Sequence, residues 1–285
     1  MSYEMAKSSI IECLMKAPNR IVAGISKRIH GSAAGLPFED WVKNTLKNCG
    51  LNVFLQEEFI GYIVKKLKES GFNAKAIENS IFEKTWWGPY VVSETQLKTA
   101  LKNEKPPVYQ QSLADIIVFY GRDLSRDLND VLIINVKSHD ESKLSRPPNI
   151  ISALRVLEFG KDLLVKAQRY PNLIEKANII FIGIYYAVKD SNAHITNIYV
   201  KDFFKLNVKV MPPINFDAAI QIQWHVRDMI EDPTIDKLTF LENLAEKYLN
   251  EWQIFMKERT RNVKEIIDEL KRLIEFYRKH RSKLK

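Results

Sequence analysis

Three short runs of β-branched and aromatic residues constrain the fold of this chain more than any other feature of its sequence. They are 114–120 (ADIIVFY), 131–136 (VLIINV) and 178–187 (NIIFIGIYYA), each bounded by polar residues. Runs of this length and composition are typical of buried strands. We expect a fourth strand at 195–200. The chain is therefore built around a sheet.

Helical segments flank these strands. Residues 3–17 and 37–48 have the apolar spacing of helices, and a third helix is expected over 149–169, directly after Pro147 and Pro148. A helix interior excludes proline, so this pair marks the start of the helix. Helices around a small mixed sheet predict an α/β or α+β fold.

The chain is long enough to bury a substantial core. Its 285 residues contain no linker rich in Pro, Gly or Ser, no internal repeat and no low-complexity segment. We therefore expect a single domain, 1–285, with a core at about 30–228 and a basic helical extension at about 237–285.

The net charge of +8 is concentrated at the C-terminal end. Residues 257–285 contain eleven Lys or Arg and five Asp or Glu, which gives +6. Apolar residues recur there at helical spacing, and they are Ile266, Ile267, Leu270, Leu273 and Ile274. This spacing predicts a long amphipathic helix with a basic outer face. Two interpretations remain open, a solvated helix end and a stripe that attracts phosphates.

Composition excludes several classes of protein. Hydrophobic residues make up 46% and charged residues 27%, which is ordinary for a globular protein and unlike a disordered or collagen-like chain. The longest apolar stretch, Ile179–Val188, is far below the roughly 20 residues of a membrane span. Charged residues interrupt the first twenty positions, so we expect no signal peptide. Two cysteines, Cys13 and Cys49, are too few for a disulfide framework, so we expect both to be core residues. We also expect the protein to be soluble and cytoplasmic.

Polar residues at the ends of two neighbouring strands could carry chemistry. Asp115 begins the first strand, and Asn135, Val136 and Lys137 close the second. Because side chains alternate along a strand, Asn135 and Lys137 project to the same face. If a hairpin around 121–130 joins the strands, then the Asp115 carboxylate, the Asn135 amide oxygen and the Val136 carbonyl converge as oxygen ligands suited to Mg²⁺. Metal-assisted hydrolysis of a phosphodiester would fit this arrangement.

This pattern alone is common. It lacks the second acid of its type, and on the pattern alone a strand edge that carries polar side chains into solvent explains it better. Other residues point elsewhere. We interpret His225 as structural, because the five histidines show no zinc spacing, and we expect Trp86 and Trp87 in a buried cluster. No glycine-rich nucleotide loop is present.

Four segments, in order along the chain, resemble one family. They are 30–39 (HGSAAGLPFE), 112–117 (SLADII), 147–153 (PPNIISA) and 215–228 (NFDAAIQIQWHVRD), and the last is the most specific. They resemble the HincII/HindII type II restriction endonucleases. The resemblance implies a PD-(D/E)xK core that cleaves duplex DNA with Mg²⁺, as a homodimer acting on a palindrome.

The resemblance also implies roles for individual residues. Asp115 matches the metal-binding acid of the first strand, and Lys137 matches the active-site lysine. Asn135 falls where the family has its second metal-binding Asp, beside the Val136 carbonyl. Glu39 matches a helix glutamate that approaches the site. The matching DNA-facing positions are Ser32, Gln110, Arg146, Asn149, Asn215 and Gln221.

The implied target is a short palindrome with outer GT and AC bases, cut to blunt ends, and a cognate DNA methyltransferase is the expected functional companion. Arg146 replaces a glutamine that presses into the base stack, which suggests different handling of the central step. Asp115 and Asn135 are twenty positions apart, longer than the family's interval, and the extra polar residues fit a longer hairpin loop.

Asn135 departs from the family most. Its amide oxygen can ligate Mg²⁺ but brings no charge, so three accounts remain open. The natural enzyme tolerates Asn, with charge supplied by Asp130, Asp140 or Glu39. Alternatively, Asp was changed to Asn to block cleavage, or the chain is an inactive relative that only binds DNA. A repair or defence nuclease with the same core is a further alternative.

Overall fold

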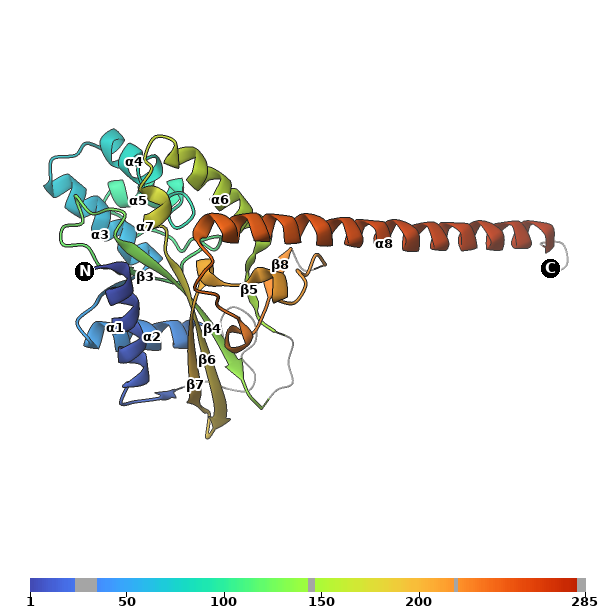
Figure 1. Ribbon diagram of the computed structural model, residues 1–285, viewed down its shortest axis with the longest axis horizontal. Coiled ribbons are helices and arrows are strands. Elements are labelled where there is room, and N and C mark those ends of the chain that lie inside the picture. The colour runs from blue at the N-terminus through green and yellow to red at the C-terminus, as the bar shows by residue number, and fades with distance from the viewer. Residues whose placement is uncertain (24–34, 143–146, 218–219, 281–285) are drawn as a thin grey trace.

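The computed structural model describes residues 1–23, 35–142, 147–217 and 220–280, with side chains as far as 273. A six-stranded mixed sheet forms its centre, in the order β1-β7-β6-β4-β3-β2 (Figure 1). Its strands are β1 (Ile21–Val22), β2 (Asn52–Leu55), β3 (Ile116–Phe119), β4 (Val131–Asp140), β6 (Ile179–Lys189) and β7 (Asn192–Asp202). The β4–β6 pair is parallel and the other pairs are antiparallel. The mixed α+β fold is therefore confirmed.

Both faces of this sheet are buried. Ile117 and Ile133 pack into one hydrophobic cluster, whereas Ile116 and Ile134 pack into another. Strands that are buried on both faces have nearly unbroken apolar sequences. That is why β3, β4 and β6 could be recognised in the sequence.

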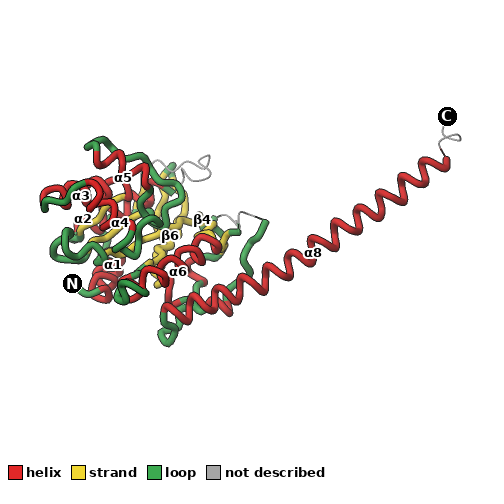
Figure 2. Tube along the Cα trace, turned by 90° about the horizontal axis from the view of Figure 1, so that it is seen from above, coloured by secondary structure: helices red, strands yellow, loops and turns green. Residues whose placement is uncertain are grey.

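Two groups of helices cover the two faces. Helices α1 (Tyr3–Met15) and α2 (Leu36–Asn48) contribute their buried residues to the cluster that contains Ile116. The opposite cluster receives apolar side chains from several helices and from the start of the C-terminal helix, residues 240–244. The several helices are α3 (Gln56–Glu69), α4 (Ala74–Phe82), α5 (Glu94–Leu101) and α6 (Ala153–Ala167), with the short α7 (Leu173–Lys176) beside them. Figure 2 shows these helices packed around the strands.

The expected helix over 149–169 is partly wrong. Its first four residues form β5 (Asn149–Ser152), which pairs with β8 (Gln221–Gln223) in a separate two-stranded sheet. Helix α6 begins only at Ala153, where the Ser152 side chain accepts a hydrogen bond from the Arg155 backbone N–H and caps the helix. The residue before a proline favours extended backbone, and here the extended segment also continues beyond Pro148.

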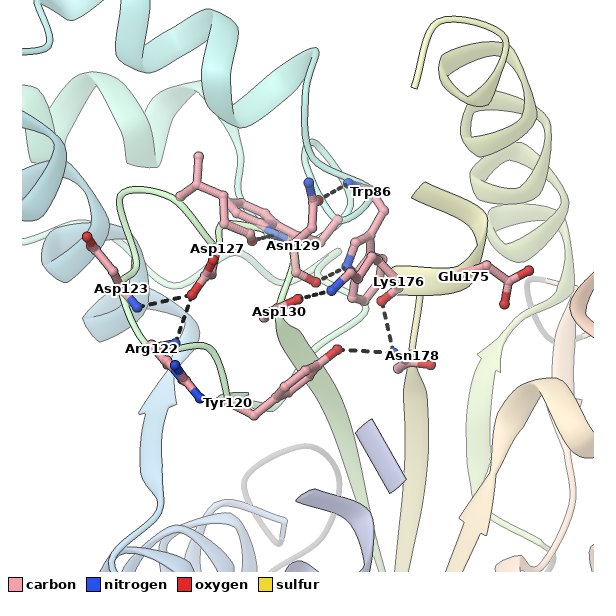
Figure 3. A network of polar contacts seen from close by, with 12 residues as sticks. Trp86, Tyr120, Arg122, Asp123, Asp127, Asn129, Asp130, Glu175, Lys176 and Asn178 are labelled. Carbon is pink, nitrogen blue, oxygen red and sulfur yellow. Dashed lines mark hydrogen bonds and ion pairs between the residues drawn. The ribbon is translucent and has the colours of Figure 1, made fainter. Parts of the chain in front are cut away.

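The long β3–β4 loop is held by polar contacts within the loop and to neighbouring segments (Figure 3). The Asp127 carboxylate accepts hydrogen bonds from the backbone N–H groups of Arg122 and Asp123, at 2.8 and 3.1 Å. The Asn129 side chain accepts a 3.0 Å bond from the Trp86 N–H, and Lys176 pairs with Asp130. The expected hairpin with a long loop is confirmed, and this loop lies at the end of β3 opposite Asp115.

The two cysteines correct one expectation. Cys13 of α1 and Cys49, at the C-terminal end of α2, form a disulfide, whereas we expected two separate core residues. They are 36 residues apart, so spacing gave no sign of the pairing. Trp86 and Trp87 are buried, as expected.

The predicted C-terminal helix is present as α8 (Lys237–His280). Its 44 residues give it a length of about 66 Å. Its first part packs against α6 and against the turns at 203–210, and the rest extends away from the body (Figure 1). Within the described ranges, no helix is long and apolar enough to cross a membrane.

Candidate active site

The β3–β4 hairpin brings Asp115 next to Asn135 and Lys137. Because Ile116 pairs with Ile134, Asp115 lies opposite Asn135, on the same face of the sheet. The Asp115 backbone N–H donates to the Ile134 carbonyl at 3.0 Å. Its carboxylate accepts a 2.7 Å bond from the Val136 N–H and lies 3.8 Å from the Lys137 ammonium. The last two contacts share one carboxylate oxygen, Oδ2, which is therefore held beside the lysine.

Asn135 contributes a buried oxygen. Its side chain is 5% exposed, and its amide nitrogen donates to the Leu113 carbonyl at 3.4 Å. Its Oδ1 has no hydrogen-bond partner within the described part of the chain. A buried acceptor without a partner is unfavourable, so such an atom commonly serves a ligand, ion or water.

The Val136 carbonyl shares this edge. In a strand the N–H and C=O of one residue point to the same side, and the Val136 N–H donates to Asp115. The carbonyl therefore points to the same side of β4, the side of β3. Two of the proposed oxygen ligands thus come from adjacent residues of one strand.

Glu39 approaches the same place from α2. Burial, and after it the nearby Asp115 carboxylate, raise the pKa of its carboxyl to about 7, although Lys137 acts in the opposite direction. Among the acids that could compensate for Asn135, Glu39 is the one near the site. Asp130 pairs with Lys176 at the far end of the hairpin. The Asp140 carboxylate, which points to the other face of β4, accepts bonds from Ser142 at 2.7 and 3.0 Å.

The donor set fits a hard cation. Two carboxylates, an amide oxygen without a partner and a backbone carbonyl are oxygen donors of the kind that Mg²⁺ prefers. No group of three or more His, Cys, Asp or Glu side chains is placed to hold a metal in the residues that the structure describes. The site thus depends on Asn135 and Val136 as well as on carboxylates, and it carries less negative charge than a site with a second Asp.

A cavity of about 570 Å³ opens over these groups. Six residues that sequence analysis singled out line it, and they are Gln110, Asp115, Asn135, Lys137, Asn149 and Gln221. Arg155 and Glu158 also line it and were not anticipated. The Arg155 guanidinium donates to the Tyr109 hydroxyl at 2.9 Å and lies over the Tyr90 ring.

A row of side-chain amides runs from this cavity to Asn215. The Asn215 amide donates to the Gln223 oxygen at 2.8 Å, and the Gln223 amide donates to the Asn149 oxygen at 2.6 Å. Asn149 and Gln223 are partners in the β5–β8 pair. Asn215 itself lines a neighbouring cavity of about 600 Å³. Gln223 was missed, although its position two residues after Gln221 places both on one face of β8.

Helix α8 holds the segment that carries Asn215. The Glu251 carboxylate accepts a 2.7 Å bond from the Ile214 N–H and pairs with Lys247 at 2.7 Å. Lys247 in turn donates to the Met211 carbonyl at 2.9 Å. The Phe216 ring packs against Tyr248, Trp252 and Phe255 of α8. The orientation of Asn215 therefore depends on the inner part of α8.

Two expected DNA-facing residues, Ser32 and Arg146, lie outside the described residues. His225 packs edge-on against the His139 ring, with the ring centroids 4.5 Å apart, and near Tyr185. Burial lowers the pKa of His225 and of His139, which favours neutral rings. This packing agrees with the structural interpretation of His225.

A mixed sheet flanked by helices, with an acid and a lysine beside each other on an antiparallel strand pair, is the core expected of a restriction endonuclease. A family model described as restriction endonuclease HincII matches residues 15–277 of the 285-residue chain. The chain therefore belongs to the HincII restriction endonuclease family, whose members are type II site-specific deoxyribonucleases. None of the curated proteins compared with the chain matches it.

Proposed function

We propose that the chain cleaves duplex DNA within a short palindrome, as a homodimer, in a reaction that requires Mg²⁺. The observation that carries this proposal is the joint placement of Asp115, Lys137 and the Asn135 oxygen in one cavity with Asn149 and Gln221. The groups of a hydrolytic centre and amides that can contact base edges would then face the same DNA substrate.

Four groups would hold the metal ion. They are the carboxylates of Asp115 and Glu39, the Asn135 Oδ1 and the Val136 carbonyl. When bound, Mg²⁺ supplies polarisation of a phosphoryl oxygen and a lower pKa of a coordinated water. Binding also removes the unfavourable burial of the Asn135 oxygen, since it gains a partner there.

The protein's own side chains would complete the reaction. The Lys137 ammonium, held by Asp115, is placed to stabilise negative charge that develops on the phosphate and to orient the attacking water. Burial raises the pKa of Glu39 to about 7 in the metal-free protein, and a bound cation would favour its ionised form. Cutting both strands at symmetry-related positions calls for two copies of the site about a two-fold axis.

Base recognition would come from the row of amides. Asn and Gln side chains can pair with the N6 and N7 edge of adenine in the major groove. Asn149, Gln223 and Asn215 already form one connected set. Outer GT and AC bases would present adenines to such a set. An endonuclease that cuts such a site would also need a cognate methyltransferase to protect the host DNA.

Digestion of a defined plasmid and of phage DNA in Mg²⁺, followed by mapping of the ends, tests this proposal. Discrete fragments are expected, with blunt ends that map to one palindromic sequence. A ladder or smear without preferred ends would favour a repair or defence nuclease instead. Binding without scission, in Mg²⁺ and in Mn²⁺, would favour a DNA-binding relative.

Asn135 makes this last outcome worth testing directly. If Asn135→Asp cleaves and the original chain does not, the asparagine blocks an otherwise complete site. If both cleave, Glu39 and Asp115 supply enough charge. If neither cleaves, the catalytic part of the proposal is wrong.

A further inference from the structure

The outer part of α8 carries a row of apolar side chains that nothing covers in the described part of the chain. We call Met256, Val263, Ile266, Ile267, Leu270 and Leu273 the outer stripe. These side chains are between 44 and 65% exposed. Beyond Arg259, which pairs with Asp217, the described contacts stay within the helix itself.

The spacing of the outer stripe is that of a paired helix. Met256, Val263 and Leu270 are seven residues apart, and Ile266 and Leu273 follow the last two of these after three residues. Apolar residues at such alternating three- and four-residue steps form the contact line of coiled coils. An exposed apolar row of this kind marks an interaction surface.

The length of the outer stripe indicates its partner. From Met256 to Leu273 it extends about 26 Å along the helix. Outside α8, no described helix or strand exposes more than three large hydrophobic side chains. A straight apolar surface of equal length is available from the same helix of a second copy. Two identical stripes related by a two-fold axis complement each other.

Charge supports pairing between like copies. Residues 249–273 contain six Lys or Arg and five Asp or Glu, so this part of the helix is nearly neutral. Two such helices do not repel each other strongly. The five basic residues without acidic neighbours lie beyond the outer stripe, from Arg278 to Lys285. DNA phosphates would be attracted to that end rather than to the apolar row.

We propose that the outer stripe of α8 packs against the outer stripe of a second copy of this chain. The choice of a second copy rests on the homodimer of the proposed function. The inner part of the same helix holds Ile214 and Phe216 next to Asn215. The pairing therefore connects the recognition segments of the two copies through two continuous helices.

Two double variants of the full-length chain test this pairing. Ile266→Gln with Leu270→Gln makes the outer stripe polar and keeps the net charge. Lys264→Gln with Glu265→Gln also keeps the net charge and changes the opposite face, so it is the matched control. Glutamine is a good helix former and all four side chains are exposed, so both variants should fold. Circular dichroism checks their helicity.

Sedimentation without DNA gives the readout. We expect the original chain and the control to be dimers, and the stripe variant to dissociate at least about 100-fold more readily, because each dimer loses four interface side chains. A stripe variant that dimerises as tightly as the control would overturn the proposal and leave the homodimer intact. An original chain that is monomeric at every concentration would overturn both, and plasmid cleavage would still test the nuclease separately.

Discussion

Replacing Glu39 by glutamine should stabilise the metal-free protein at high pH and hardly change it at low pH. Burial and the Asp115 carboxylate raise the pKa of Glu39 from its ordinary value of 4.5 to about 7 in the folded protein. The unfolded chain therefore releases this proton at lower pH than the folded chain does. The free energy of unfolding therefore decreases as the pH rises from about 4.5 to 7, and it stays at the lower value above pH 7.

The structure sets the size of this effect. The difference between 4.5 and about 7 corresponds to about 3 kcal/mol at most. Because the carboxyl is only partly buried, solvent screening reduces this to about 1.5 kcal/mol. Glutamine is neutral at every pH, so Glu39→Gln should raise the free energy of unfolding by about that amount at pH 8, and by little at pH 5.

Urea unfolding in EDTA at the two pH values measures this difference. Glu78→Gln is the control, because Glu78 is an exposed carboxylate of α4 that is not among the charges acting on Glu39, and surface changes commonly shift stability by less than about 0.5 kcal/mol. Adding Mg²⁺ should stabilise the original chain more than it stabilises the Glu39→Gln variant. An equal effect of Glu39→Gln at pH 5 and pH 8 would refute the placement of this carboxyl beside Asp115.

Asn135→Asp should lower the Mg²⁺ concentration for half-maximal cleavage by about tenfold or more, because a further charged ligand joins Asp115 and Glu39. Cleavage titrations measure this concentration, and an unchanged requirement would argue against Asn135 as a ligand. Glu251→Ala should reduce discrimination between cognate and near-cognate sites by about tenfold, since Ile214 loses its acceptor, whereas Glu251→Gln should retain most of it. Competition cleavage of the two sites gives the ratio, and Glu246→Ala, on the exposed side of the same helix, is the control. Phe216→Ala should destabilise the protein by about 3 kcal/mol because three aromatic contacts are lost, and a change below about 1 kcal/mol in urea unfolding would contradict this packing.

Sequence alone could predict the elements whose own residues show a recognisable apolar pattern. β3, β4 and β6 are buried on both faces, and α1 and α2 have regular apolar spacing. β5 and β8 are only four and three residues long, and they are strands because they pair with each other across the chain. Helix α3 was overlooked, although Phe59, Ile63 and Leu67 recur every four residues.

The same distinction applies to the site. Strand alternation predicted that Asn135 and Lys137 share one face, and a hairpin between the two strands was expected to bring Asp115 to Asn135. The connection of Asn149 through Gln223 to Asn215 depends on tertiary pairing. The raised pKa of Glu39 depends on the packing of α2 against one face of the sheet, so no local pattern could reveal it.

The central claim is that Asp115 and Lys137 form one hydrolytic centre. Alanine replacement of each, assayed for plasmid cleavage and for binding to the mapped DNA site, tests it most directly. The account predicts that either replacement lowers the cleavage rate by at least about 1,000-fold while site binding in Ca²⁺ changes far less. Cleavage at the original rate by either variant would contradict it.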